Sequence, residues 1–203
     1  DSCVTVSAVY PFGGVIHERS NIVLVEDLDG PLMVVQSDPP DGAIDARQPS
    51  RPDGTLPVGY RSVDIKLSGD ICFLTRFDFT ATQAGGVLGG PFIQSVEAVD
   101  ARTVRVHLNR DLEPQTWTTV THIGSGSSVT VGYLPGDVSG DGIVTSDDLL
   151  VLIDALNNPA VVLPLRSSDL DRSGSLSPAD LLRAVDLIIG ADAFDPWNLR
   201  SLP

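Results

Sequence analysis

The chain has 203 residues and a formal net charge of −14 at pH 7, with 27 acidic and 13 basic residues, among which Lys66 is the only lysine. Such a balance excludes a basic surface able to neutralise phosphates, so we do not expect nucleic acid as a partner. The sequence contains no run of 18 apolar residues, and we therefore expect no membrane-spanning helix.

The first 31 residues are expected to form strands. Residues 3–10 and 21–26 are rich in apolar and β-branched residues and surround a Pro-Phe-Gly-Gly turn at 11–14. We assign 1–31 to an N-terminal strand segment, packed as a hairpin on the following β domain. A second interpretation stays open, in which a strand adds to the sheet edge of a neighbouring copy and makes the chain a component of a polymer or complex.

Residues 32–134 show the alternation typical of strands with one buried and one solvated face. Apolar residues alternate with polar neighbours at Val63, Ile65 and Leu67, at Val104, Val106 and Leu108, and at Val129, Val131 and Tyr133. Phe77 and Phe79 flank Asp78 in the same way. Turns containing Gly, Pro and Asp separate these short runs, so the pattern predicts an antiparallel β-sandwich.

The order of these segments resembles a bacterial Ig-like domain. The run Ser-Asp-Pro-Pro-Asp-Gly-Ala at 37–43 is similar to the opening S-x-P-x-x-G-A segment of such domains. The later pieces follow in the same order at 60–67, 77–81, 95–108 and 112–121. The resemblance implies an Ig-like β-sandwich over about 32–134 that acts as a spacer, an adhesion module or a small binding platform.

Two segments of twelve residues near the C-terminus, 137–148 and 169–180, have oxygen-bearing side chains at positions 1, 3, 5, 9 and 12 and glycine at position 6. This spacing is typical of an EF-hand calcium loop, in which position 7 adds a backbone carbonyl. The predicted ligands of the first loop are Asp137, Ser139, Asp141, Ile143 (carbonyl), Thr145 and Asp148. Those of the second loop are Asp169, Asp171, Ser173, Ser175 (carbonyl), Ser177 and Asp180.

The chemistry of calcium explains this spacing. The ion takes six to eight oxygens at about 2.3–2.6 Å, so the loop must wrap around it and point its carboxylates inward. Gly142 and Gly174 stand where the chain must turn sharply and where a Cβ is costly. A pair of Asp-, Gly- and Ser-rich turns without an ion is the alternative, but two aligned matches favour calcium, and we expect two ions.

Each loop leads into a predicted helix. The apolar residues fall on one helical face at Leu149, Leu152, Ile153 and Leu156, and again at Leu181, Leu182, Val185, Ile188 and Ile189, with Gly190 at the C-cap. No convincing helix precedes either loop. A duplicated loop–helix unit with Asp at position 12 resembles the type I dockerin module. The resemblance covers about 136–198, and we assign 135–203 to a dockerin-like calcium-binding domain.

The resemblance implies an extracellular module that folds on calcium and docks onto a cohesin domain. In such modules positions 10 and 11 of the loop often help to set the choice of cohesin, and similar pairs in both repeats permit two docking orientations. Here the pairs are Ser146-Asp147 and Pro178-Ala179, which are chemically unlike. We therefore do not expect docking in two orientations.

Cys3 and Cys72 are the only cysteines of the chain. In an extracellular protein they suggest a disulfide that fastens the N-terminal segment to the sandwich. Two buried free thiols are the alternative. The spacing is not C-x-x-C, so we expect neither a zinc site nor a redox motif.

Residues of catalytic type are scattered. There is no G-x-S-x-G motif, residues 124–128 predict a turn between strands, and His17, His107 and His122 are far apart in the sequence. We therefore expect a non-enzymatic chain. Because it begins at Asp1, we expect a mature or processed form of a secreted or cell-surface bacterial protein.

Two functions stay open. In the first, the dockerin-like module mediates calcium-dependent docking or attachment to a cohesin-like partner, and the Ig-like domain is its spacer or adhesion module. In the second, the chain is a structural subunit of an extracellular assembly or filament. Calcium then only folds and braces the C-terminal module, and copies of the chain bind one another.

Overall fold

The computed structural model describes residues 3–12, 15–24, 32–49, 60–71, 73–191 and 194–203, with 3–12 and 15–24 described by their backbone. The strands are β1 (Cys3–Phe12), β2 (Val15–Leu24), β3 (Val34–Asp38), β4 (Ala43–Asp45), β5 (Ser62–Leu67), β6 (Phe79–Gly85), β7 (Ile93–Ala98), β8 (Thr103–Leu108), β9 (Thr116–His122) and β10 (Ser128–Tyr133). The helices are the 3₁₀ turn η1 (Arg76–Asp78), α1 (Asp147–Asn157), α2 (Leu165–Ser168) and α3 (Pro178–Ile189).

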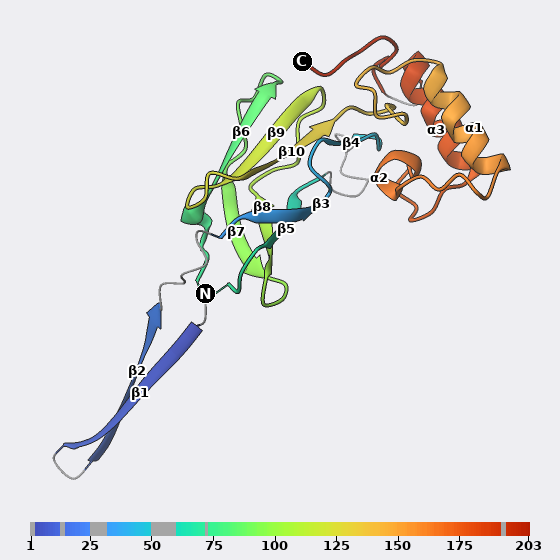
Figure 1. Cartoon of the computed structure of the whole chain (residues 1–203). Helices are drawn as coiled ribbons and strands as arrows, with labels where there is room; N and C mark the ends of the chain where they lie inside the picture. The colour runs from blue at the N-terminus through green and yellow to red at the C-terminus, as the bar shows by residue number, and fades with distance from the viewer. Residues whose placement is uncertain (1–2, 13–14, 25–31, 50–59, 72, 192–193) are drawn as a thin grey trace.

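Two four-stranded sheets form the middle of the molecule (Figure 1). One sheet has the order β3-β5-β8-β7 and the other the order β4-β10-β9-β6. All neighbours are antiparallel except β4 and β10, which pair in parallel. The β-sandwich is therefore confirmed, while the expectation of a purely antiparallel one is wrong at β4. The reason is topological, because the chain leaves the first sheet after β3 and enters the second beside the last strand.

Alternating side chains from both sheets build the core of the sandwich. Val63, Ile65 and Leu67 of β5 are buried, and so are Val104, Val106 and Leu108 of β8 and Val129, Val131 and Tyr133 of β10. Successive side chains of a strand point to opposite faces, so every second residue reaches the space between the sheets. The three strands predicted from alternation are confirmed.

The segment around Phe77 differs from its prediction as a strand. Arg76–Asp78 form the turn η1, and Phe77 is 74% exposed, whereas Phe79 opens β6 and is buried. The cause is a capping box. The backbone N–H and the hydroxyl of Thr75 donate to Oδ2 of Asp78 at 2.7 and 2.9 Å, and this interaction favours a helical turn over a strand.

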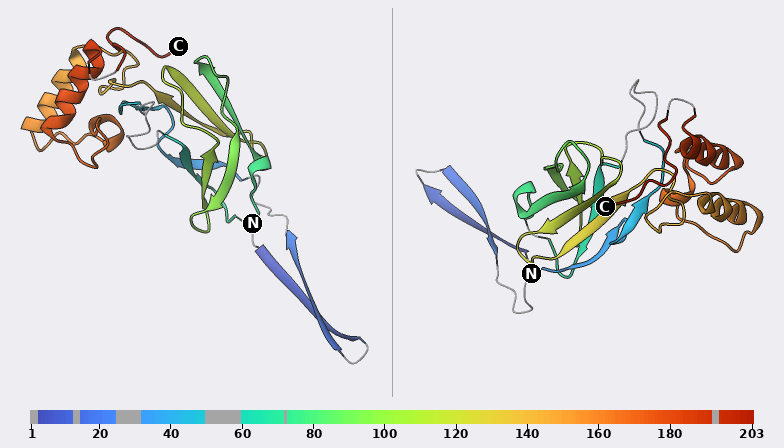
Figure 2. Two further views of the ribbon diagram at one scale, coloured as in Figure 1. Left: turned by 180° about the vertical axis from the view of Figure 1, so that it is seen from behind. Right: turned by 90° about the horizontal axis from the view of Figure 1, so that it is seen from above.

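The N-terminal strands β1 and β2 pair over their full length, from Cys3 opposite Leu24 to Phe12 opposite Val15. They form a two-stranded sheet of their own, and in the described part of the chain they join neither sandwich sheet. Figures 1 and 2 show this hairpin projecting away from the sandwich. The hairpin is as expected from the sequence, but it does not extend the sandwich.

The C-terminal module contains α1 and α3, which lie side by side in Figures 1 and 2. Leu152 of α1 and Ala184, Leu187 and Ile188 of α3 are buried against the loops. Gly190 ends α3 in the left-handed conformation, with φ of 76°, as the sequence predicts. None of the helices in the described part of the chain is long and apolar enough to cross a membrane.

The predicted helix faces are only partly right. Ile153 is 39% exposed, and Leu182 and Ile189 are 68% and 64% exposed, although the sequence pattern placed all three on the apolar face. The single-turn helix α2 also precedes the second loop, where no convincing helix was expected. In α3 the apolar residues cover more than one face of the helix, and the face that contains Ala184 is the one buried by packing.

Candidate metal centres

The first loop folds around two buried carboxylates at its ends. Asp137 accepts hydrogen bonds from the backbone N–H groups of Gly140 and Gly142 at 2.8 and 2.9 Å. Asp148 accepts from the backbone N–H groups of Ser139 and Thr145 at 2.9 and 2.8 Å. Backbone N–H groups between the first and last positions of the loop therefore hold both carboxylates in place.

The other predicted residues of the first loop lie around this pair. Asp141 is exposed and accepts from the N–H of Ile143 at 2.9 Å, and the hydroxyl of Ser139 lies 3.4 Å from Oδ1 of Asp137. The hydroxyl of Thr145 accepts from the N–H of Asp147 at 3.2 Å and so caps α1. Ile143, whose backbone carbonyl is a predicted ligand, is 45% exposed and forms a β-bridge with Ser201 near the C-terminus.

The second loop repeats the arrangement of the first. Asp169 accepts from the N–H groups of Ser173 and Gly174 at 2.8 and 3.0 Å. Asp180 accepts from the N–H groups of Asp171 and Ser177 at 3.1 and 2.7 Å. In both loops the residue at position 12 thus binds the N–H groups at positions 3 and 9, and the residue at position 1 binds that at position 6. The carboxylates at positions 1 and 12 are therefore held by the same backbone contacts in both loops, although only the second loop brings three carboxylates within 4.8 Å of one another.

The second loop brings three carboxylates together. Carboxylate oxygens of Asp169, Asp171 and Asp180 all lie within 4.8 Å of one another, and no other cluster of this kind occurs among the residues that the structure describes. The hydroxyl of Ser173 lies 3.2 Å from the carbonyl oxygen of Ser175, and that of Ser177 lies 3.1 Å from Oδ2 of Asp180. The predicted oxygens of this loop therefore surround one small volume.

Among the described residues the loop carboxylates form no ion pair with a basic side chain, and Arg172 of the second loop donates to the carbonyl of Gln48 instead. None of the ion pairs found in the described part of the chain involves a predicted ligand. Burial, together with the charges of Asp148 and Asp141, raises the pKa of Asp137 to about 6 despite the backbone N–H donors that lower it. Burial likewise raises the pKa of Asp180. Buried carboxylates with raised pKa values and no ion-pair partner among the described residues suit a hard divalent cation such as calcium.

A family model for the type I dockerin domain matches residues 135–185. The C-terminal module of this chain is a type I dockerin-like domain. Dockerin domains bind calcium and dock onto cohesin partners, and they are non-catalytic. The match confirms the resemblance inferred from the two loops, and the β-rich structure ahead of it is compatible with an Ig-like domain.

The other comparisons add little. A search of curated protein sequences found no match. Among solved structures, an L,D-transpeptidase from Mycobacterium smegmatis superposes with a TM-score of 0.34 at 11% identity over 52% of this chain. The chain spans 41% of the length of that protein. A likeness this slight says nothing about activity.

In the dockerin-like module the residues at loop positions 10 and 11 lie at the starts of the two long helices. Ser146 and Asp147 at α1, and Pro178 and Ala179 at α3, are all exposed. One pair is polar and acidic, while the other is apolar. The two helix starts therefore offer chemically different surfaces to a partner.

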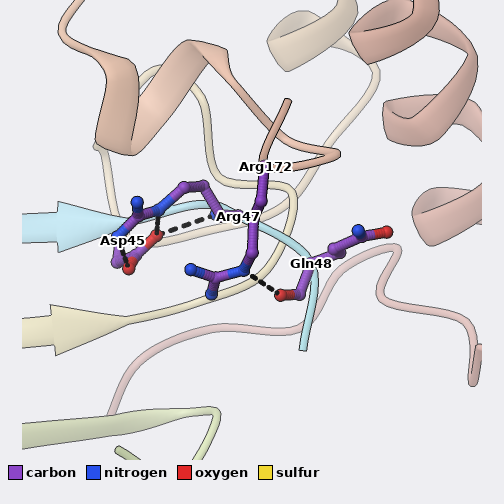
Figure 3. A network of polar contacts seen from close by, with 4 residues as sticks. All are labelled: Asp45, Arg47, Gln48 and Arg172. Carbon is purple, nitrogen blue, oxygen red and sulfur yellow. Dashed lines mark hydrogen bonds and ion pairs between the residues drawn. The ribbon is translucent and has the colours of Figure 1, made fainter. Parts of the chain in front are cut away.

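A buried segment after β4 attaches the sandwich to the second loop (Figure 3). The N–H of Ala46 donates to the carbonyl of Arg166 at 2.9 Å, and the N–H of Gln48 donates to that of Leu170 at 3.0 Å. The side-chain amide of Gln48 donates to the carbonyl of Asp171 at 3.0 Å, and Nε of Arg172 donates to the carbonyl of Gln48 at 3.1 Å. We call residues 45–48 the strap.

Charge and packing fix the strap in place. The guanidinium of Arg47 forms a two-pronged ion pair with buried Asp45 at 2.9 and 2.7 Å, which Figure 3 also shows. Ala46 is fully buried in one apolar cluster with Val138, Leu152, Leu170 and Ala184 of the dockerin-like module. The core of the module is therefore completed by a residue from the sandwich side of the chain.

The C-terminal tail attaches the sandwich to the first loop. The N–H of Val144 donates to the carbonyl of Arg200 at 2.9 Å, and the N–H of Leu202 donates to that of Gly142 at 3.0 Å. Arg200 also donates to the side-chain oxygen of Gln115, ahead of β9, at 3.1 Å. Each loop is thus braced against the sandwich by a different segment.

Sequence reasoning missed these braces. Gln48 and Arg172 contact each other across more than a hundred residues; Gln48 belongs to no motif, and Arg172 stands at a loop position that is not a predicted ligand. The sequence contained one signal, an arginine at a loop position that is glycine in the first loop. Arg172 stands at loop position 4, where the first loop has Gly140, and both residues have positive φ, 63° and 74°. The loop geometry therefore requires a left-handed residue at position 4, and in the second loop that residue is an arginine that donates to the carbonyl of Gln48.

The described residues do not test the predicted disulfide between Cys3 and Cys72. Cys72 and the side chain of Cys3 lie outside the described residues. The bridge remains a sequence-based prediction.

Proposed function

We propose that the chain is a non-enzymatic, extracellular calcium-binding protein whose dockerin-like module docks a cohesin-like partner. The observation that supports this most is the repeated loop geometry, in which position 12 binds the N–H groups of positions 3 and 9 in both loops. Two copies of this arrangement, each with buried carboxylates that form no ion pair among the described residues, favour two equivalent ions. The Ig-like sandwich acts as spacer or adhesion module.

The proposed ligands are the twelve residues predicted from the two loops. The first site uses Asp137, Ser139, Asp141, the carbonyl of Ile143, Thr145 and Asp148. The second uses Asp169, Asp171, Ser173, the carbonyl of Ser175, Ser177 and Asp180. Side-chain carboxylates supply the charge, and hydroxyl and carbonyl oxygens complete the shell around the ion.

We infer three parts in the chain, at 1–31, 32–134 and 135–203. The sandwich core and the two apolar clusters of the C-terminal part support the second boundary. Four residues that precede the boundary nevertheless pack in the clusters of the C-terminal part: Ile44, Ala46 of the strap, Trp117 and Leu134. The strap makes the Ig-like domain a direct support for the second calcium site.

Docking is tested with a panel of immobilised cohesin domains and the calcium-loaded chain. Because the two helix starts are unlike, we expect one orientation, so that either Ser146→Arg or Ala179→Arg abolishes binding while the other leaves it unchanged. Asp137→Ala and Asp169→Ala serve as variants that lack one calcium site each. Binding that survives both single arginine substitutions and is lost only in the double variant would show two orientations. Binding to no cohesin in the panel would count against this function.

A second function is supported by a different observation. The hairpin β1–β2 forms a sheet separate from the sandwich, which suits a chain that contacts other copies of itself in an extracellular assembly. In that case calcium folds and braces the C-terminal module, and the contacts between subunits lie elsewhere. Sedimentation of the chain in calcium distinguishes the two, because a docking module stays monomeric without its partner.

A further inference from the structure

We propose that the β1–β2 hairpin of one chain adds to the outer edge of β6 in a second copy of the chain. This contact would supply what the second function requires, and it does not depend on docking because it uses neither calcium loop. The inference rests on two features: a hairpin without a third strand among the described residues, and a β6 edge whose first part has no charge, proline or register shift.

In the described part of the chain, the hairpin has no third strand beside it. Its strands pair with each other from Cys3–Leu24 to Phe12–Val15 and with no other strand in the described part of the chain. An isolated two-stranded hairpin is at best marginally stable in water, and three strands or a packed face are needed. Among the described residues, the hairpin therefore has no third strand to stabilise it.

The sequence of β1 suits it for strand addition. In a chain with a net charge of −14, residues 3–12 contain no Asp, Glu, Lys or Arg. Charged residues on an edge strand are a common means by which proteins prevent the addition of another strand. The strand β2 contains Glu18 and Arg19, so the open edge of β1 is the better donor.

Three of the four sheet edges in the sandwich are protected. In the first sheet, β3 and β7 each contain a register shift, and β7 also contains Glu97. In the second sheet, β4 has only three residues and continues directly into the strap. Bulges, charges, shortness and cover all hinder strand addition.

The fourth edge, β6, has no charge, proline or register shift, and cover lies only over its later part, near Gln83 and Gly85. Its seven residues, Phe-Thr-Ala-Thr-Gln-Ala-Gly, contain neither charge nor proline. They pair with β9 in unbroken register from Phe79 opposite His122 to Gly85 opposite Thr116. Later in the strand, Gly90 of the following loop comes close to Gln83, so the first part of β6 is the open part.

An apolar groove of about 340 Å³ follows this open part of β6. Its lining comes from β6 (Phe79, Thr80 and Ala81), from the segment 91–93 and from η1, where Arg76 adds one basic side chain. Phe92 is 59% exposed, and Phe77 at the end of the groove is 74% exposed. Backbone pairing along β6 would place alternate apolar side chains of an added strand over this groove, as in strand addition generally.

The occupant is a second copy because the hairpin points away from its own sandwich. Figures 1 and 2 show the hairpin extending beyond the end of the sandwich near η1, while β6 runs from η1 towards the opposite end. Donor and acceptor are different surfaces, so the contact is head-to-tail. Such contacts form rings or filaments, depending on whether the rotation closes.

Sedimentation velocity of the full chain in calcium, from micromolar to near-millimolar concentration, tests the inference. The fraction of wild-type protein in species larger than a monomer should increase with concentration. Thr80→Lys places a charge on the exposed side of β6 and should weaken association by about tenfold or more. Ser7→Pro removes a backbone donor from the middle of β1 and should do the same. Ser95→Lys on β7 is the matched control and should associate like wild type.

Mixing the two defective chains is the decisive step. Thr80→Lys retains an intact hairpin, and Ser7→Pro retains an intact β6 edge, so the mixture should form a dimer of one chain of each kind and nothing larger. Thermal melts confirm that each variant is folded, and Thr82→Lys, also exposed on β6, replaces Thr80→Lys if that variant unfolds.

Three results would overturn the inference. These are a wild-type chain that stays monomeric at all concentrations, a β6 lysine variant that associates like wild type, and a mixture that stays monomeric. Association that a calcium chelator abolishes and the β6 variant leaves intact would place the contact on the dockerin-like module. That last outcome refutes the strand addition and leaves the docking function standing.

Discussion

Gln48 and Arg172 each donate one hydrogen bond across the contact between the strap and the second loop. The side-chain amide of Gln48 donates to the carbonyl of Asp171, next to Arg172, and the guanidinium of Arg172 donates to the carbonyl of Gln48. Asp171 is a predicted calcium ligand, and Gln48 lies in the strap that follows β4. The second loop, the proposed calcium site, is therefore joined to the sandwich by hydrogen bonds of its own residues.

Gln48→Ala should destabilise the folded chain. Gln48 is 1% exposed, and its loss leaves the carbonyl of Asp171 without this donor in a buried interface. We expect the free energy of unfolding to fall by about 1–3 kcal/mol. Urea denaturation followed by circular dichroism measures it, with Gln94→Ala on exposed β7 as control. Equal unfolding curves for the two variants would contradict a structural role for the strap.

Calcium should protect the strap from hydrogen exchange. The amides of Ala46 and Gln48 donate to the carbonyls of Arg166 and Leu170, immediately ahead of and within the second loop. An ion that orders this loop should slow the opening of both hydrogen bonds. Exchange measured with calcium and with chelator should therefore differ at these amides and agree in β8, which lies in the sandwich core. Calcium-independent exchange at Ala46 and Gln48 would show that the loop and the strap are uncoupled.

The metal-free protein should become more stable as the pH falls from 7 to 5. Burial raises the pKa of Asp137 to about 6, above its unfolded value of about 4, so the folded state binds more protons between these values. Stability therefore decreases as pH rises through this window and levels off above it. Asp100 and Glu113 have lowered pKa values and contribute in the opposite direction, but at more acidic pH.

Thermal melts of chelator-treated protein at pH 5 and pH 7 measure this dependence. Asp137→Asn is the matched variant, because it removes the titrating group and should flatten the profile. Calcium should reverse the trend, since the ion competes with protons for the same carboxylates. A wild-type melting temperature that rises from pH 5 to pH 7 without calcium would contradict the assignment.

Gly132→Ala should disturb the contact between the sandwich and the C-terminal cluster. A Cβ at Gly132 in β10 would lie 2.8 Å from Cζ3 of Trp117 and 3.0 Å from side-chain carbons of Ile44 and Leu202. Three neighbours would have to move together, at an expected cost of about 1–3 kcal/mol. Ser128→Ala, at an exposed position of the same strand, is the control in urea denaturation. A cost at Gly132 no larger than that at Ser128 would show that this interface is loosely packed.

Local patterns predicted much of this fold. Alternation identified β5, β8 and β10 because burial in a two-layer sandwich has the period of the strand itself. The loop spacing identified Asp137 and Asp169 because the geometry of a calcium shell fixes the order of its ligands. Both signals lie within a few residues of sequence.

The features that the sequence did not reveal depend on contacts between distant segments. The parallel pairing of β4 with β10, the strap at 45–48 and the tail along the first loop all join residues far apart in the chain. The exposure of Leu182 and Ile189 was missed because α3 has apolar residues on more than one face. Only the partner helix and loops decide which face is buried.

Calorimetric titration of calcium into chelator-stripped protein, followed by melts with and without the ion, tests the central claim most directly. The account predicts two bound ions in the wild-type chain and one in Asp137→Ala or Asp169→Ala. Asp147→Asn, an exposed acidic residue beside a predicted ligand, should retain two. Calcium should raise the melting temperature of the wild-type chain. Heat of binding that is absent, or that survives loss of both Asp137 and Asp169, would mean that the two loops are turns without an ion.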